Sequence, residues 1–116
     1  MRVIVCGSRA WTDREQIADR LFDLPPGSII VHGAAKGADT IAHQEAQKLG
    51  HFPEPYPYQP FISSTVSAKR APLERNKYMA SLGADLCIAF WDGRSTGTAH
   101  MVDCADAQVI ELELVT

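Results

Sequence analysis

The amino-acid sequence predicts an α/β protein, a three-layer sandwich with a mostly parallel, five-stranded sheet between two layers of helices. Short apolar runs, several rich in β-branched residues, alternate along the chain with stretches of helical period. This strand–helix–strand repeat is typical of a parallel sheet covered on both faces, because each crossover returns the chain to the same edge. We expect the strand order 3-2-1-4-5.

The first half of the chain predicts two strands and two helices. A short β-branched run, RVIVC (2–6), predicts a strand that ends at Gly7. A helix is expected over 11–24, where Thr12 and Glu15 have the spacing of a capping box. SIIVHG (28–33) predicts the second strand. Residues 37–50 have alanine and isoleucine at helical spacing and Gly50 as a stop.

The second half predicts three strands and two helices. FPEPYPY (52–58) alternates but contains three prolines, which restrict a strand to the sheet edge. Residues 59–71 have no clear period and form a connection long enough to suggest a function. The remaining elements are expected in this order: helix 72–83, strand 84–91, a helix from about Thr98 to Asp106, and strand 108–115.

Composition and charge restrict the class of protein. The chain has 116 residues, 46% of them hydrophobic and 22% charged, as expected for one globular domain spanning 1–116. It has no apolar run of membrane-spanning length and no signal-peptide pattern, so we expect a cytoplasmic protein with no membrane partner. Three cysteines without CxxC spacing and four scattered histidines predict no metal site. The net charge of −3 makes general nucleic-acid binding unlikely.

In a sheet of this order, ligands bind beyond the carboxyl ends of the strands, near the point where the strand order reverses. Three loops are therefore candidate ligand-binding segments: 7–12, 33–38 and 91–98. In the first, Gly7 permits close backbone approach, Ser8 offers a hydroxyl and Arg9 a guanidinium suited to phosphate. The alternative is an ordinary turn in which Trp11 packs against the following helix.

The second loop presents almost no side-chain bulk. Gly33, Ala34 and Gly37 would let a ligand lie against main-chain N–H groups at the start of a helix, with Lys36 beside it. The alternative is tight packing of helix on sheet. Asp39 could cap the helix or accept a hydrogen bond from a ribose hydroxyl.

The third loop combines glycines and hydroxyls just before a helix. Its candidate ligand-binding residues are Gly93, Ser95, Thr96, Gly97 and Thr98, preceded by Asp92 at the end of a strand. Backbone N–H groups at a helix start can hold a phosphate without a buried lysine. The alternative is an ordinary strand-to-helix turn.

The basic residues have an uneven distribution along the chain. Eight of the eleven lie in or near these loops and the third predicted helix: Arg9, Arg14, Lys36, Lys69, Arg70, Arg75, Lys77 and Arg94. A locally positive cleft on an acidic protein suits a small anionic ligand, whereas ordinary solvated surface charge is the alternative. GxGxxG after the first strand and GxxxxGK[ST] are both absent, which makes a conventional dehydrogenase and a P-loop NTPase unlikely.

Four segments resemble, in order and spacing, the YspA-like family of the SLOG superfamily, which occurs in bacteria and phage: VCGSRAWTDRE, VHGAAKGADTIA, PLERNKYMA and AFWDGRSTGTAHMV. The superfamily also contains the DNA-processing protein A domain and the Lonely Guy phosphoribohydrolases. The resemblance covers most of the chain. It implies a Rossmann-like domain that binds a nucleotide or a nucleotide-derived ligand such as an ADP-ribose-like compound.

Our leading hypothesis is a sensor or sequestering protein for such a ligand, with Arg75 and Asn76 facing it from the third helix. Trp11 or Trp91 would stack on a base or instead pack in the core. No cofactor is expected, and we expect a homodimer.

Two other functions follow from the resemblance. Lonely Guy enzymes cleave the N-glycosidic bond of a nucleoside monophosphate with an arginine and a glutamate. Arg75 and Met79 match the arginine motif, and Gly97 and Thr98 match the glycine–threonine motif, but Met101 occupies the glutamate position. A hydrolase would therefore need Arg75 to bind the phosphate and Asp92 to act as the acid/base.

Single-stranded DNA binding, as in DNA-processing protein A, is a further alternative that rests on the superfamily alone.

Overall fold

The computed structural model describes all of residues 1–116 and contains a five-stranded, all-parallel sheet. Its order is β3-β2-β1-β4-β5, which confirms the predicted three-layer fold. The strands are β1 (Arg2–Gly7), β2 (Ile29–His32), β3 (Phe52–Pro55), β4 (Leu86–Phe90) and β5 (Glu111–Val115). In the central register, Val3 of β1 lies between Ile30 of β2 and Leu86 of β4.

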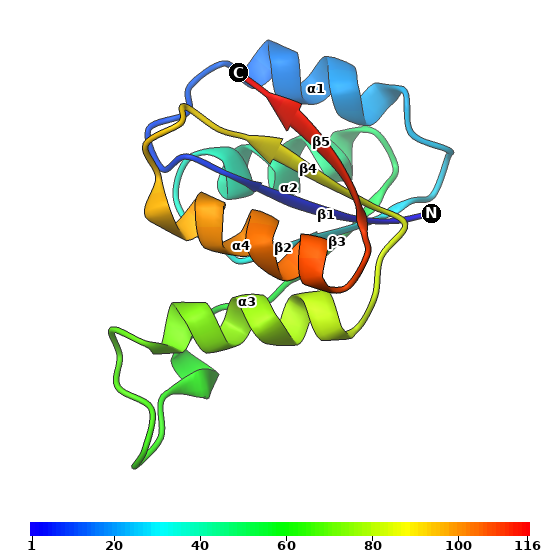
Figure 1. Ribbon diagram of the computed structural model, residues 1–116. Coiled ribbons are helices and arrows are strands. Elements are labelled where there is room, and N and C mark those ends of the chain that lie inside the picture. The colour runs from blue at the N-terminus through cyan, green and yellow to red at the C-terminus, as the bar shows by residue number, and fades with distance from the viewer.

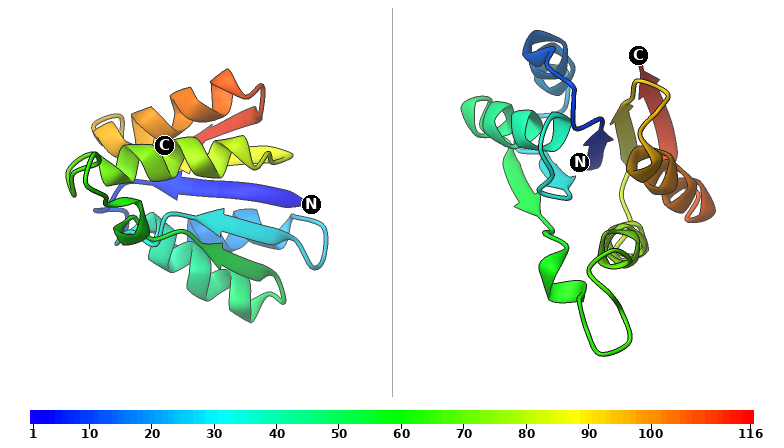
Figure 2. Two further views of the ribbon diagram at one scale, coloured as in Figure 1. Left: turned by 90° about the horizontal axis from the view of Figure 1, so that it is seen from below. Right: turned by 90° about the vertical axis from the view of Figure 1, so that its left-hand side faces the viewer.

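Two helices cover each face of the sheet (Figures 1 and 2). α1 (Arg14–Phe22) and α2 (Ala38–Lys48) pack on one face. α3 (Ala71–Ser81) and α4 (Thr96–Ala107) lie on the other, and a short 3₁₀ helix, η1, spans Gln59–Phe61. None of the helices combines the length and apolar character needed to cross a bilayer.

The central strand β1 separates two apolar cores because successive side chains of a strand point to opposite faces. Val3 and Val5 contribute to the core beneath α1 and α2, together with Ile17. Ile4 and Cys6 contribute to the core beneath α3 and α4. All four side chains are buried, which explains why the sequence of β1 is a continuous apolar run.

Two predicted helix starts are wrong. α1 begins at Arg14, and its N-cap is Asp13, whose carboxylate accepts the Gln16 N–H at 3.1 Å, so Thr12 and Glu15 do not form a capping box. α4 begins at Thr96, two residues earlier than expected, because Ser95 is its N-cap. Gly97 and Thr98 therefore lie in the first helical turn, where backbone N–H groups have no intrahelical partners.

The prediction that the proline-rich strand lies at a sheet edge is confirmed: β3 is an outer strand. The N–H groups of Phe52 and Tyr56 bond to carbonyls at either end of β2. Because the backbone groups of alternate strand residues point to the same neighbouring strand, the backbone nitrogens of Pro53 and Pro55 point away from β2. Neither proline has an N–H to offer, so this edge has lost its outward donors.

Residues 57–70, called the arm below, project from the body at the carboxyl end of the sheet (Figure 1, lower left; Figure 2, right). Aromatic packing fixes the base of the arm. The Tyr78 ring of α3 lies 5.8 Å from that of Tyr56 and 5.6 Å from that of Phe61, measured between centroids. The segment predicted as a long connection is thus anchored to α3.

Candidate functional site

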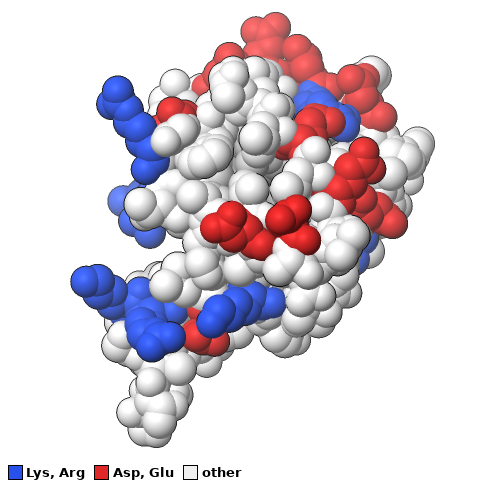
Figure 3. All heavy atoms as spheres, in the orientation of Figure 1, with Lys and Arg blue, Asp and Glu red and all other residues white.

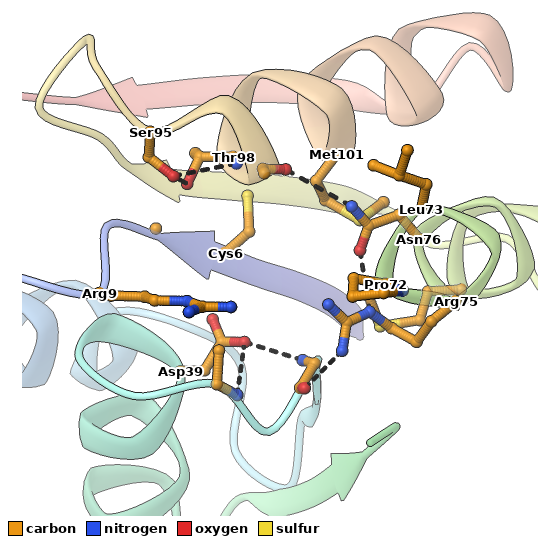
Figure 4. A pocket seen from close by; sticks show the side chains of 15 residues that line it. Cys6, Arg9, Asp39, Pro72, Leu73, Arg75, Asn76, Ser95, Thr98 and Met101 are labelled. Carbon is orange, nitrogen blue, oxygen red and sulfur yellow. Dashed lines mark hydrogen bonds between the residues drawn. The ribbon is translucent and has the colours of Figure 1, made fainter. Parts of the chain in front are cut away.

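The carboxyl ends of the strands border a cleft made of three adjacent hollows. Arg9 and Pro72 line all three. The inner cavity, about 90 Å³, lies at the base of the cleft (Figure 4). The α4 lobe, about 890 Å³, is lined by the start of α4 and by Lys69, and the β2 lobe, about 270 Å³, by residues 33–36 and 57–59.

The loops after β1 and β2 interlock at one side of the cleft. Ala38 N–H donates to the Ser8 carbonyl at 3.2 Å. A Cβ on Gly37 would lie 2.4 Å from the carbonyl oxygens of both Ser8 and Arg9, and the φ of Gly37 is +76°. Only glycine suits this position, because any side chain would collide with backbone and adopt a strained conformation.

Asp39, in the first turn of α2, presents a buried carboxylate to the inner cavity. Its Oδ2 accepts hydrogen bonds from the Gly33 N–H at 3.0 Å and the Ala35 N–H at 3.3 Å. Burial raises the pKa of Asp39 to about 6, against the opposing effects of these N–H groups and of the Arg75 and Arg9 charges. Asp39 thus shapes the β2 loop, but its Oδ1 forms no hydrogen bond within the chain.

Arg75 extends from α3 across the cleft to the β2 loop and is 8% exposed. Its Nη1 donates to the Gly33 carbonyl at 2.6 Å and to the Tyr56 carbonyl at 3.1 Å, while its Nε donates to Asn76 Oδ1 at 2.9 Å. Burial lowers the pKa of Arg75, and the nearby Asp39 partly offsets this effect. Arg75 fixes the position of α3 relative to the loop while its Nη2 remains without a protein acceptor.

Asn76 connects α3 to α4. Its side-chain amide donates to the Gly97 carbonyl at 3.4 Å and lies 3.1 Å from His100 Nδ1. With the amide nitrogen as donor, His100 Nδ1 accepts, and His100 Nε2 lies 3.8 Å from Cys104 Sγ. His100 lines the α4 lobe, where Nε2 is a candidate donor to a ligand.

The start of α4 has two unpaired N–H groups beside the α4 lobe. Ser95 Oγ accepts the Thr98 N–H at 3.2 Å, and the Ser95 carbonyl accepts the Ala99 N–H at 3.1 Å. The N–H groups of Thr96 and Gly97 have no acceptor within the chain, and both residues are exposed. Two free donors at the positive end of a helix dipole form a site suited to an anion.

Asp92 has a structural role in the turn before α4. Its Oδ1 accepts the Arg94 N–H at 2.8 Å and the Ser95 N–H at 3.1 Å, and its own N–H donates to Ser8 Oγ at 3.1 Å. The bonds from Arg94 and Ser95 lower the pKa of this exposed carboxyl. A carboxyl held in the ionised form is poorly suited to donate a proton as a general acid.

The structure brings most of the predicted ligand-binding residues together. Fourteen of them line the cleft: Gly7, Ser8, Arg9, Gly33, Ala34, Lys36, Asp39, Arg75, Asn76, Asp92, Ser95, Thr96, Gly97 and Thr98. Gly37, Gly93 and Trp11 do not. Trp11 packs instead on Phe90 beneath α1, with ring centroids 5.8 Å apart. Trp91 braces the turn before α4 through a 3.1 Å bond to the Ser95 carbonyl.

Several residues that line the cleft were not predicted as ligand-binding: Cys6, Pro57, Tyr58, Gln59, Pro72, Leu73, Met79, His100 and Met101. Helical spacing could have identified two of them, because Pro72 lies three residues before Arg75 and His100 lies four after Thr96. Tyr58 had no such signal, since its position depends on how the arm leaves the sheet edge.

Basic side chains gather on both sides of the hollow at the carboxyl end of the sheet, while many acidic ones lie away from it (Figure 3). Arg9, Lys69 and Arg94 line the α4 lobe, as expected. Three residues assigned to this basic group pair elsewhere. Arg14 bonds to Glu45 of α2 at 2.9 Å, and Lys77 and Arg70 pair with Glu74 at 3.4 and 3.8 Å. The positive region is therefore smaller than the sequence suggested.

Comparison with known proteins agrees with this fold and motif set. Residues 1–51 match the family model YAcAr, described as the YspA, cpYpsA-related SLOG family. The Gene 61 protein of Mycobacterium phage D29 is 41% identical over 106 residues, which cover 85% of this chain and 83% of that protein. The chain belongs to the YspA, cpYpsA-related SLOG family. The family resemblance inferred from the four motifs is confirmed.

Two solved structures share the fold of this SLOG-family chain. DNA processing protein A (DprA) from Streptococcus pneumoniae superposes with a TM-score of 0.78 at 20% identity, covering 99% of this chain. The SLOG-family chain spans half the length of that DprA chain. The C-terminal domain of the PF1911 hydrogenase from Pyrococcus furiosus gives a TM-score of 0.53 at 13% identity, covering 99% of this chain and 91% of that domain.

Proposed function

We propose that the protein binds a nucleotide or a nucleotide-derived small molecule, with a phosphate at the start of α4. Family membership and the DprA-like fold are consistent with a nucleotide-related or DNA-processing role. The observation that carries the proposal is the pair of free N–H groups on Thr96 and Gly97, which border a lobe lined by Arg9, Lys69 and Arg94. Backbone donors and guanidinium groups together suit a phosphate dianion.

The α4 lobe, at about 890 Å³, lies within the size range of small-molecule sites. A hydrolase would need Asp92 as its acid/base, but this exposed carboxylate near the start of α4 is bonded within a turn. The arrangement therefore supports a role as a sensor or sequestering protein. A small ligand is favoured over a DNA strand because the basic groups line a confined cleft.

Thermal-shift measurements with inorganic phosphate, AMP, ADP, ADP-ribose, NAD and cyclic AMP would test the proposal. A ligand that binds only the folded chain raises its Tm by mass action. The discriminating variant is Thr96→Pro, which deletes one free N–H at the first helical position, where proline is tolerated. Ser95 has ψ of 117°, which is compatible with a following proline.

The matched control is Thr96→Ala, which keeps the N–H. We expect Thr96→Pro to weaken binding about tenfold and Thr96→Ala to leave it within about twofold, because one charge-assisted hydrogen bond is lost only in the former. Absence of a shift with every compound would reject the proposal. Salt-sensitive binding of single-stranded oligonucleotides, without nucleotide binding, would favour the DNA-processing alternative.

A further inference from the structure

Asp39 is the most unusual polar side chain of the cleft because half of its carboxylate is unused. The residue is only 6% exposed, and both backbone donors bond to the same oxygen, Oδ2. None of the ion pairs in the chain involves Asp39, Arg9 or Arg75. No buried side-chain oxygen of the chain lacks a hydrogen-bond partner, so the unbonded Oδ1 is the part of Asp39 that is open to the inner cavity.

Arg75 places a complementary group in the same cavity. Its Nη1 and Nε are used by the protein, whereas Nη2 is not. Figure 4 shows the bonded oxygen of Asp39, Oδ2, on the side of the Arg75 guanidinium, while the oxygen without a hydrogen bond lies beneath Arg9. A free acceptor and a free donor that line the same cavity suit the hydroxyl groups of a diol, which can donate to the first and accept from the second.

The rest of the inner cavity excludes larger polar groups. Cys6, Met79 and Met101 provide an apolar wall, and the cavity volume is only about 90 Å³. A base together with its sugar and phosphate does not fit in this space. The hydroxylated edge of a pentose fits, with C–H groups against the apolar wall, while the base and phosphate extend into the two outer lobes.

Resting on the function proposed above, we infer that the inner cavity binds the 2′,3′-diol edge of a ribose, so that Asp39 and Arg75 select ribonucleotides over deoxyribonucleotides. One ribose hydroxyl donates to Asp39 Oδ1, and a hydroxyl of the same diol accepts from Arg75 Nη2. The neighbouring hydroxyl lies toward Thr98, which also lines the cavity. A ligand without the hydroxyl would leave Asp39 Oδ1 and Arg75 Nη2 desolvated and without a partner, and such a loss discriminates strongly against it.

The test compares ribose 5-phosphate with 2-deoxyribose 5-phosphate, and AMP with its 2′-deoxy and 3′-deoxy forms. Amide NMR spectra would follow each titration. Inorganic phosphate serves as the reference that engages only the start of α4. We expect at least one deoxy form to bind about tenfold more weakly than AMP, because a hydrogen bond to a charged group is lost. We also expect the Gly33 and Ala35 amides, which donate to Asp39, to shift with the ribose compounds alone.

The decisive variant is Asp39→Asn, which keeps the shape of the side chain and an acceptor for the two amides. We expect it to reduce the preference for ribose to within about threefold while phosphate still binds. Asp19→Asn, an exposed site on α1, is the matched control and should keep the full preference. Equal binding of ribose and deoxyribose compounds to the native chain would overturn this inference and leave the proposed function intact. Failure of phosphate and of every nucleotide to bind would overturn both.

Discussion

Arg75 contributes to stability as well as lining the cleft, because three groups depend on its guanidinium. Arg75→Met would leave the carbonyls of Gly33 and Tyr56 and the Asn76 side chain without this donor. Unsatisfied buried acceptors cost about 1–3 kcal/mol each, and partial relaxation reduces the sum. We expect the free energy of unfolding, measured with urea, to fall by about 2–4 kcal/mol.

The control for this prediction is Arg70→Met, at the start of the same helix. The Arg70 side chain is 67% exposed, and its only ion pair, with Glu74, spans 3.8 Å. Such surface pairs contribute little, so we expect a change below about 0.5 kcal/mol. Equal effects of the two substitutions would show that the bonds of Arg75 do not hold α3 against the β2 loop.

Asp39 predicts a specific dependence of stability on pH. Its pKa is raised from 3.8 to about 6 in the folded chain, so the folded state binds the proton more tightly than the unfolded state. The stability that the folded chain gains from binding the Asp39 proton is therefore fully present below pH 3.8. It is lost as the pH rises through about 6. A shift of this size corresponds to about 3 kcal/mol. The unfolding free energy of the native chain, relative to Asp39→Asn, should fall by up to that amount between pH 4 and pH 7.

A carboxyl-carbon NMR titration would give the pKa of Asp39 directly. A midpoint near 4 would contradict the prediction, because it would mean that the two N–H groups and nearby arginines outweigh the cost of burial.

Some roles of single residues cannot be predicted from the residue type alone. Arg9, Asp39 and Arg75 were predicted as ligand-binding residues from their residue types, and all three line the inner cavity. The sequence left two roles for Asp39, whereas the structure shows one oxygen bonded to loop amides and the other open to the cavity. It had no means of showing that Asp92 binds its own turn, because an Asx turn and a catalytic carboxylate have the same residue type.

Among the connecting segments, the loops after β1 and β2 place the strictest demand on residue type. Gly37→Ala would force a methyl group to within 2.4 Å of two carbonyl oxygens, at a φ of +76°. We expect a loss of at least about 3 kcal/mol in unfolding free energy, since overpacking and left-handed strain add together. Thermal or urea unfolding would measure it.

Gly50 supplies the control, because its φ of +78° is nearly the same but nothing lies within 4 Å of its Cβ position. Gly50→Ala should cost only about 1–2 kcal/mol, the conformational part alone. A Gly37 variant as stable as the Gly50 variant would show that the two loops separate easily.

The elements themselves were largely predictable. Strands β1, β2 and β4 are continuous apolar runs because a central parallel strand is buried on both faces. Helix starts were less predictable. Thr12 and Asp13 both offer an oxygen to cap α1, and the choice between them depends on the path of the loop from β1 rather than on local sequence.

At the scale of the whole molecule, the two edges of the sheet differ in their capacity to accept another strand. The outward positions of β3 are prolines, whereas β5 has none. The Trp91 N–H bonds to the Val115 carbonyl, so the backbone N–H and C=O groups of alternate β5 residues point toward β4. Those of Leu112 and Leu114 point outward. Any association between copies of the chain through the sheet is therefore expected at β5.

The expected homodimer can be tested at this edge. Leu114→Pro removes an outward N–H that the single chain does not use. We expect it to abolish concentration-dependent association in sedimentation experiments, and we expect the Leu112 amide to exchange more slowly in the associated native chain. A dimer unaffected by Leu114→Pro would show that copies meet on another surface.

The distribution of charge is also a property of the whole molecule. A net charge of −3 gives no indication that three basic side chains border one lobe of the cleft. The predicted topology located that region correctly because the strand order defines where the loops converge. The sequence did not show that Arg14 and Lys77 pair with nearby acids, because those contacts depend on how the helices pack.

The interlocking of the β1 and β2 loops has a consequence for how relatives of this chain can diversify. An insertion in either loop would separate Ser8 from Gly37 and Ala38 and so disturb the sheet beneath them. The arm has no such restriction, since it leaves the body at the sheet edge and contributes Tyr58 and Lys69 to the outer lobes. Proteins that share this scaffold are thus expected to acquire new ligands by changing the length and sequence of the arm, and directed evolution of binding should begin there.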